Sequence, residues 1–175
     1  SGPSRGNRAE TLIQPARIRE LNTKAIRKGQ YVLYWMQQSQ RVRFNHALEL
    51  AIAQANALDL PVVVGFGLTT DYPEANARHY AFMLQGLREV QRDLRARKIA
   101  FLLRRGSPDD VALRLARKAA LLVCDRGYLA HQRRWRREVA RAASCAVVQV
   151  ESDVVVPVDI ASDKREYAAR TIRPK

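Results

Sequence analysis

The sequence predicts an α/β protein built on a doubly wound, five-stranded parallel sheet, the Rossmann-like arrangement, with helices on both faces. Three observations lead to this fold class. Five short apolar runs lack polar alternation, as strands buried on both faces do. Stretches with apolar residues at helical spacing separate the runs. Each strand and helix together occupy about 30 residues, the size of a βαβ unit.

The five apolar runs are the expected strands. In chain order they are Tyr31–Met36, Val62–Phe66, Ile99–Leu103, Leu121–Cys124 and Ala146–Val150. We expect the common spatial order 3-2-1-4-5, in which the first strand lies between the second and the fourth.

Two helices are expected in the first half of the chain. Apolar residues recur at helical spacing from Phe44 to Leu58, and Pro61 ends that pattern. A second, longer helix begins between Pro73 and Asn76 and carries its apolar stripe to Leu94.

Two further helices are expected in the second half. The segment from Ser107 to Asp110 is a helix start, because Ser accepts hydrogen bonds from free backbone N–H groups, Pro suits the first turn and carboxylates favour the positive end of the dipole. Its apolar stripe continues to Ala119. The last helix passes through Leu129, Trp135 and Val139.

The ends of the chain differ from its middle. Residues 1–27 are polar and Arg-rich, with one weak apolar stripe, and we interpret them as an N-terminal arm with a short helix; the first four resemble the remnant of an expression tag. Residues 28–160 are the expected α/β domain, and 161–175 the start of an interdomain linker.

Length and charge limit the classes of protein. A chain of 175 residues corresponds to one domain. Its net charge of +14 and pI near 10.7 are compatible with weak, nonspecific binding to DNA. However, 25 of the 31 basic residues are Arg and they occur in nearly every helix, so a compositional bias with solvated basic faces explains the charge at least as well as a dedicated site.

Cysteine content and hydropathy exclude other classes. Cys124 and Cys145 form no CxxC pair, so a disulfide framework and a cysteine-based zinc site are not supported. This cysteine usage indicates an intracellular protein, cytoplasmic or associated with the nucleoid. No apolar run approaches the roughly 18 residues of a membrane span, so we expect no membrane partner.

No catalytic set is recognisable. The chain has no GxxxxGK[ST] loop, GxSxG elbow or HExxH helix. The segment from Gly65 to Thr70 begins like a dinucleotide fingerprint but lacks its third glycine. The three histidines, His46, His79 and His131, stand alone without ligands at metal-binding spacing. We therefore expect neither catalytic residues nor a metal site.

The expected topology nonetheless places a ligand site. In an open parallel sheet the ligand lies beyond the carboxyl ends of the strands, where the strand order reverses. The segments there are 37–39 after the first strand and 125–128 after the fourth, with 66–68 beside them. Asp125 ends an apolar strand, where a carboxylate is costly unless it is paired. The sequence leaves three roles open for Asp125: a helix N-cap, an ion-pair partner of Arg126 or a ligand contact.

Several longer strings resemble the N-terminal domain of class II cyclobutane-pyrimidine-dimer DNA photolyases, the deoxyribodipyrimidine photo-lyases of the cryptochrome/photolyase superfamily. The strings are Tyr31–Arg41, Asn45–Glu49, Tyr72–Asn76, Arg78–Tyr80, Asp125–Leu129 and Glu166–Lys175. The resemblance runs from about Ile18 to the last residue.

This resemblance implies that the catalytic FAD and the lesion pocket lie in a helical C-terminal domain that this chain lacks. The implied partners are that FAD domain and, through the full-length protein, ultraviolet-damaged DNA. The parent activity is that of a lyase in DNA repair, and we expect the isolated domain to be inactive in repair.

In this family the α/β domain houses, in many members, a light-harvesting antenna chromophore such as 8-hydroxy-5-deazariboflavin. Topology and resemblance together predict apolar walls from Trp35, Met36, Phe66 and Tyr128, and polar contacts from Gln38, Asp125 and Arg126. The alternatives are a basic docking or DNA-binding α/β module without a chromophore and, less favoured, a small nucleotide-dependent enzyme.

Overall fold

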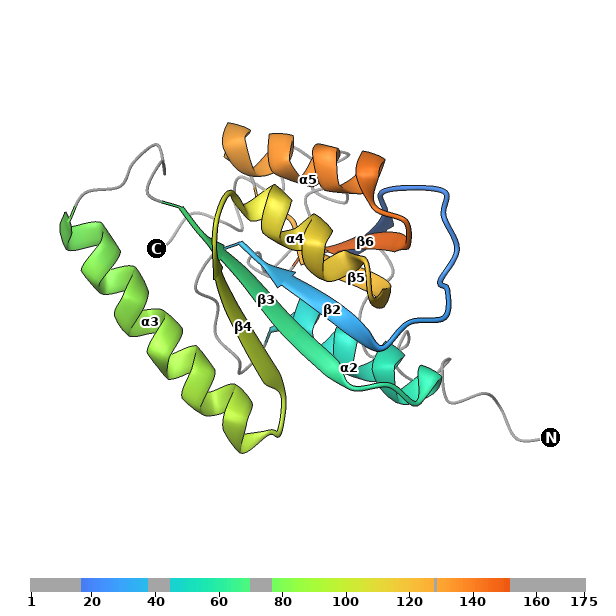
Figure 1. Ribbon diagram of the computed structural model, residues 1–175, viewed down its shortest axis with the longest axis horizontal. Helices are drawn as coiled ribbons and strands as arrows, with labels where there is room; N and C mark the ends of the chain where they lie inside the picture. Colours follow the sequence, from blue (N-terminus) through green and yellow to red (C-terminus); the bar gives the residue numbers. More distant parts are fainter. Residues whose placement is uncertain (1–16, 38–44, 70–76, 128, 152–175) are drawn as a thin grey trace, which may run out of the picture.

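The computed structural model describes residues 17–37, 45–69, 77–127 and 129–151, and contains one six-stranded sheet with helices on both faces (Figure 1). The strands are β1 (Ile18–Glu20), β2 (Tyr31–Met36), β3 (Val62–Leu68), β4 (Ala100–Arg105), β5 (Ala119–Asp125) and β6 (Ala146–Val150). The helices are α2 (His46–Leu58), α3 (Ala77–Ala96), α4 (Pro108–Ala116) and α5 (Ala130–Ala142).

The five strands expected from the sequence are confirmed, and so is their order. The sheet runs β1-β6-β5-β2-β3-β4, and every pair from β6 to β4 is parallel. The strand order therefore reverses at β2, which lies between β3 and β5. This reversal places the carboxyl ends of β2 and β5 side by side, as a doubly wound fold requires.

The sixth strand corrects one expectation. Ile18–Glu20 belong to the segment that we interpreted as a polar arm with a short helix, yet they form β1, which pairs antiparallel with β6 at the sheet edge. The contact continues beyond the strand, where Leu21 N donates to Val147 O at 2.9 Å. A strand of three residues is too short to show a period of its own, and its partner lies far away in the sequence.

Each face of the sheet has its own core. Alternation along β2 sends Val32, Tyr34 and Met36 to the side covered by α2 and α3, and Leu33 and Trp35 to the side covered by α4 and α5. The unbroken apolar runs of the sequence follow from this double covering.

The observed starts of the helices agree with the predicted ones in part. Asn45 caps α2, because its side chain accepts a hydrogen bond from Leu48 N at 3.0 Å. Pro108 opens α4 as expected, but the Ser107 hydroxyl donates to the Asp109 carboxylate instead of accepting from the backbone. The expected starts at Phe44 and between 73 and 76 lie outside the described residues.

The remaining ends are close to the predictions. Helix α4 stops at Ala116, three residues short of the predicted end, because Ala119 already begins β5. None of the helices in the described part of the chain is long and apolar enough to cross a membrane.

Candidate functional site

The candidate site lies at the carboxyl edge of the sheet, where β2 and β5 end next to each other. Trp35 is level with Cys124 in this parallel pair, so the register continued by two residues brings Gln37 level with Arg126. Gln37 follows β2 directly, and Asp125 is the last residue of β5. Both side chains are buried, with exposed fractions of 3% and 4%.

The apolar residues predicted to wall the site divide between the two faces of the sheet. Met36 and Phe66 pack in the core under α2 and α3, whereas Trp35 packs in the core under α4 and α5. All three are almost completely buried. Two other predicted residues, Gln38 and Tyr128, lie outside the described part of the chain.

Asp125 is held by a buried hydrogen-bond chain. Tyr34 Oη donates to Asp125 Oδ2 at 2.5 Å, and Asn45 Nδ2 donates to Tyr34 Oη at 3.0 Å. Since Asn45 also caps α2, this chain joins the start of α2 to the end of β5. A hydrogen-bonded carboxylate avoids most of the cost of its burial.

The side chain of Arg126 pairs with Glu151, the residue that follows β6. Its Nη1 lies 3.7 Å from Glu151 Oε2, and the Glu151 side chain is only 2% exposed. The same glutamate follows β6, and its carbonyl accepts from Arg17 Nη1 at 3.1 Å. The N-cap position of α5 belongs to Leu129, so Asp125 does not have the capping role considered from the sequence.

Several buried polar atoms at this edge have no hydrogen-bond partner among the described residues. They are both amide atoms of Gln37, Trp35 Nε1 and Gln132 Nε2. Alternation along the chain puts Gln37 on the same side as Trp35, the side that α5 covers. A buried polar atom without a partner costs about 1–3 kcal/mol of folding free energy, so these atoms make the edge at the strand-order reversal a candidate ligand site.

Gln132 was not among the residues predicted for the site. Its side chain fits under the β5–α5 turn because residue 127 is a glycine. The amide of Gln132 lies so close under the β5–α5 turn that a Cβ at position 127 would be 2.3 Å from its Oε1. That oxygen accepts from Leu129 N at 3.3 Å. The signal in the sequence was a glutamine three residues before Trp135, on the apolar face of α5.

Arg136 supports the same turn from the helix side. It is buried, and its Nη1 donates to Gly127 O at 3.0 Å and to Asp125 O at 3.4 Å. The guanidinium thus donates to one carbonyl at the end of β5 and to one in the turn after it. Among the described residues no group of three or more His, Cys, Asp or Glu could hold a metal ion.

Residues 32–175 match the family model described as DNA photolyase. The deoxyribodipyrimidine photo-lyase of Methanothermobacter thermautotrophicus is 51% identical over 165 residues, covering 94% of this chain and 37% of that relative. The enzyme of the same name from Arabidopsis thaliana is 36% identical over 176 residues, covering 93% of this chain and 34% of its own length. The chain thus spans little more than a third of the length of these relatives.

A solved structure of a functionally unknown protein from Pseudomonas aeruginosa shares the fold, with a TM-score of 0.54 at 18% identity over 85% of this chain and 55% of that one. Identity this low shows the fold alone. The assignment to a family rests instead on the sequence matches, which cover almost all of the α/β sheet. The chain belongs to the DNA photolyase family and corresponds to its N-terminal α/β domain.

Proposed function

We propose that this domain holds a planar antenna chromophore of the 8-hydroxy-5-deazariboflavin type at the carboxyl edge between β2 and β5. Its excitation would pass to the FAD of a helical domain in the whole class II photolyase, which repairs cyclobutane pyrimidine dimers. The domain alone would bind the chromophore without repairing DNA.

The observation that carries this proposal is the buried amide of Gln37. Both of its polar atoms are without a partner among the described residues, and they offer one acceptor and two N–H donors. The pyrimidinedione edge of a deazaflavin presents carbonyl oxygens and an N–H group, which are the complementary set. Trp35 Nε1 adds one further donor on the same side of the sheet.

The surrounding residues would keep these groups in place. The chain from Asn45 through Tyr34 to Asp125 fixes the end of β5 against α2, and Arg136 fixes the turn after it. A site with preset donors and acceptors loses little entropy when a flat ligand binds.

Such a site needs no acid, base or nucleophile. When bound, the chromophore supplies absorption of near-ultraviolet or blue light and dipolar energy transfer. The protein contributes binding, orientation and exclusion of water. The absence of a recognisable catalytic motif in the sequence agrees with this role.

The test is a titration of the chain with 8-hydroxy-5-deazariboflavin, followed by absorption and fluorescence. We expect saturable binding that Gln37→Leu weakens at least about tenfold, corresponding to about 1.4 kcal/mol. Gln91→Leu, an exposed change of the same kind on α3, should bind like the unmodified chain. Failure of the unmodified chain to take up the chromophore, or equal affinity in Gln37→Leu, would overturn the proposal.

A further inference from the structure

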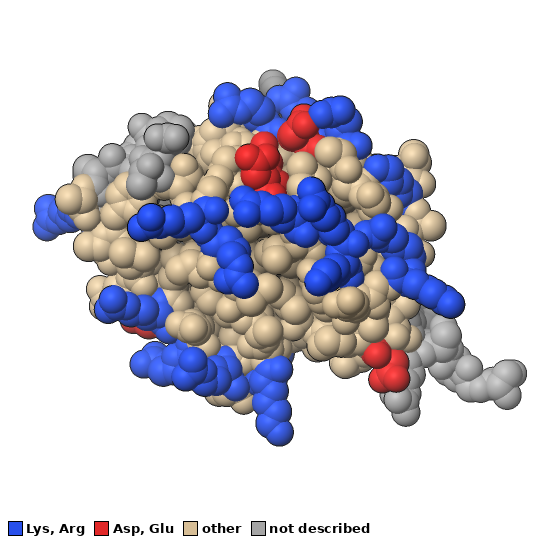
Figure 2. Space-filling model, viewed as in Figure 1, with Lys and Arg blue, Asp and Glu red and all other residues tan. Residues whose placement is uncertain are grey.

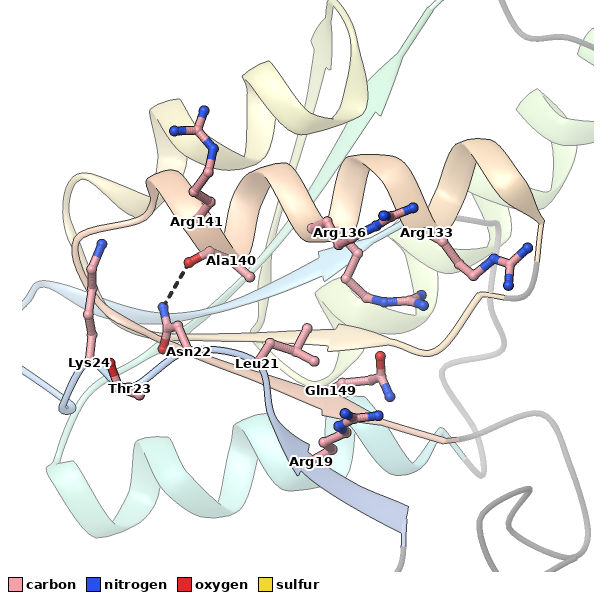
Figure 3. A pocket seen from close by; sticks show the side chains of 11 residues that line it. Arg19, Leu21, Asn22, Thr23, Lys24, Arg133, Arg136, Ala140, Arg141 and Gln149 are labelled. Atoms are coloured by element: carbon pink, nitrogen blue, oxygen red, sulfur yellow. Dashed lines mark hydrogen bonds between the residues drawn. The ribbon is translucent and has the colours of Figure 1, made fainter. Parts of the chain in front are cut away.

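A basic cleft lies between β1, the segment after it and α5; we call it the β1–α5 cleft (Figure 3). Its volume is about 710 Å³. Six cationic side chains line it: Arg19, Lys24, Arg133, Arg136, Arg137 and Arg141. None of the described residues that line it is acidic, so the cleft concentrates positive charge well beyond the average of the surface.

One wall of the cleft is fixed by Asn22. Its Nδ2 donates to Ala140 O at 3.2 Å and to Cys145 O at 3.1 Å, while its Oδ1 accepts from Val147 N at 3.1 Å. The first of these bonds is visible in Figure 3. This amide therefore holds the segment after β1 against the end of α5 and the start of β6. The cleft is a built feature of the fold.

The other wall is a row of arginines on α5. Arg133, Arg137 and Arg141 recur every four residues, so they follow one another along the helix at steps of about 6 Å. Arg141 pairs with Glu138, but Arg133 and Arg137 are exposed and make no ion pair among the described residues. Figure 2 shows how few acidic side chains interrupt the basic ones on the face it presents.

Arg19 faces this row from β1. It is level with Gln149 of β6 in the antiparallel pair, and both side chains line the cleft. Arg19 likewise makes no ion pair within the described part of the chain. Cations on opposite walls can contact phosphate oxygens from two directions, and a guanidinium can do so with two parallel hydrogen bonds.

The other residues that line the β1–α5 cleft limit the kind of nucleic acid that it could bind. No aromatic side chain from the described part of the chain lines the cleft, so the described lining offers no platform on which unpaired bases could stack. Duplex nucleic acid presents its phosphates outward and needs no such platform. We propose that the β1–α5 cleft binds the phosphodiester backbone of duplex DNA without sequence preference, as a contact made by this domain itself.

The test measures the anisotropy of a short fluorescent, undamaged DNA duplex against chain concentration at several salt concentrations. We expect Arg133→Gln/Arg137→Gln to weaken binding at least about tenfold at low salt. The same variant should reduce the slope of log affinity against log salt by about 1.8, the value for two lost phosphate contacts.

The matched control is Arg88→Gln/Arg92→Gln on α3. It removes the same charge from two exposed arginines at the same spacing, outside the cleft. We expect it to retain most of the affinity and the slope. Equal losses in the two double variants, no salt-dependent binding by the unmodified chain, or tighter binding of single strands than of the duplex would overturn the proposal.

Discussion

Tyr34 Oη donates to Asp125 Oδ2 across 2.5 Å, and this bond joins β2 to the end of β5 inside the protein. Tyr34 is completely buried, and Asp125 nearly so. Because the bond involves a carboxylate, it is of the stronger, charge-assisted kind. It anchors one side of the candidate chromophore site to the core under α2.

Removing this hydroxyl should cost more than removing an ordinary one. We expect Tyr34→Phe to lower the free energy of unfolding by about 1.5–3 kcal/mol, because the buried carboxylate of Asp125 then loses this charge-assisted hydrogen bond. Tyr31 Oη donates to the neutral carbonyl of Leu115, also at 2.5 Å. Tyr31→Phe should therefore cost only about 0.5–1.5 kcal/mol. Urea unfolding of both variants measures the difference, and equal losses would contradict the charge-assisted role.

Burial of the Gln37 amide should lower the free energy of unfolding. This buried amide has no hydrogen-bond partner among the described residues, so replacing it with an apolar side chain of similar size removes two polar atoms from the interior. We expect Gln37→Leu to raise the free energy of unfolding by about 1–2 kcal/mol. Exposed Gln91→Leu should stay within about 0.5 kcal/mol of the unmodified chain. A large loss of stability in Gln37→Leu would mean that this amide has a structural partner.

The β5–α5 turn predicts a strong coupling between Gly127 and Gln132. Gly127→Ala should cost about 1–3 kcal/mol, since its Cβ would lie 2.3 Å from Gln132 Oε1 and displace the whole amide. In a Gln132→Ala background the same change should cost much less, because Oε1 and Cδ are then gone and only the Cβ of residue 132, at 3.0 Å, stays close. Thermal unfolding of the two single variants and the double variant completes the cycle, and additive losses would contradict the contact.

Because the thiol of Cys124 is buried, we expect the stability of the protein to change with pH in the alkaline range. Desolvation raises the pKa of this thiol from 9.0 to about 12. The unfolded state therefore loses its proton first as pH rises above about 9, and the stabilisation that is complete below that pH is lost progressively toward pH 12. We expect the free energy of unfolding to fall between pH 9 and 10.5 less steeply in Cys124→Ala than in the unmodified chain. Identical pH profiles would count against this account.

The central sheet could be predicted from the sequence because its strands carry unbroken apolar runs, of which Val62–Phe66 is one example. Strand β1 could not, because three residues such as Ile18–Glu20 have no detectable period and depend on a partner more than 100 residues away for their hydrogen bonds. Likewise, local sequence could not decide whether the Ser107 hydroxyl would accept from the backbone or donate to Asp109.

The sequence predicted the edge of the sheet at which the candidate site lies, but not the contacts between its side chains. The reversal of strand order at β2 located the edge, and Asp125 was recognised as a buried carboxylate. Its partner Tyr34 was not predicted, since this contact depends on the register between β2 and β5. Gln132 was missed because helical spacing shows only which face a residue shares, not whether its amide finds a partner.

The most direct measurement is a ¹H–¹⁵N spectrum of the side-chain amides, recorded with and without saturating 8-hydroxy-5-deazariboflavin. We expect the resonances of Gln37 and Gln132 to shift, because their amides lie buried at the carboxyl edge of β2 and under the β5–α5 turn. The amide of Gln149 in the β1–α5 cleft should not shift. Unchanged Gln37 resonances at saturation, or a shift at Gln149 in their place, would contradict an antenna site at the strand-order reversal.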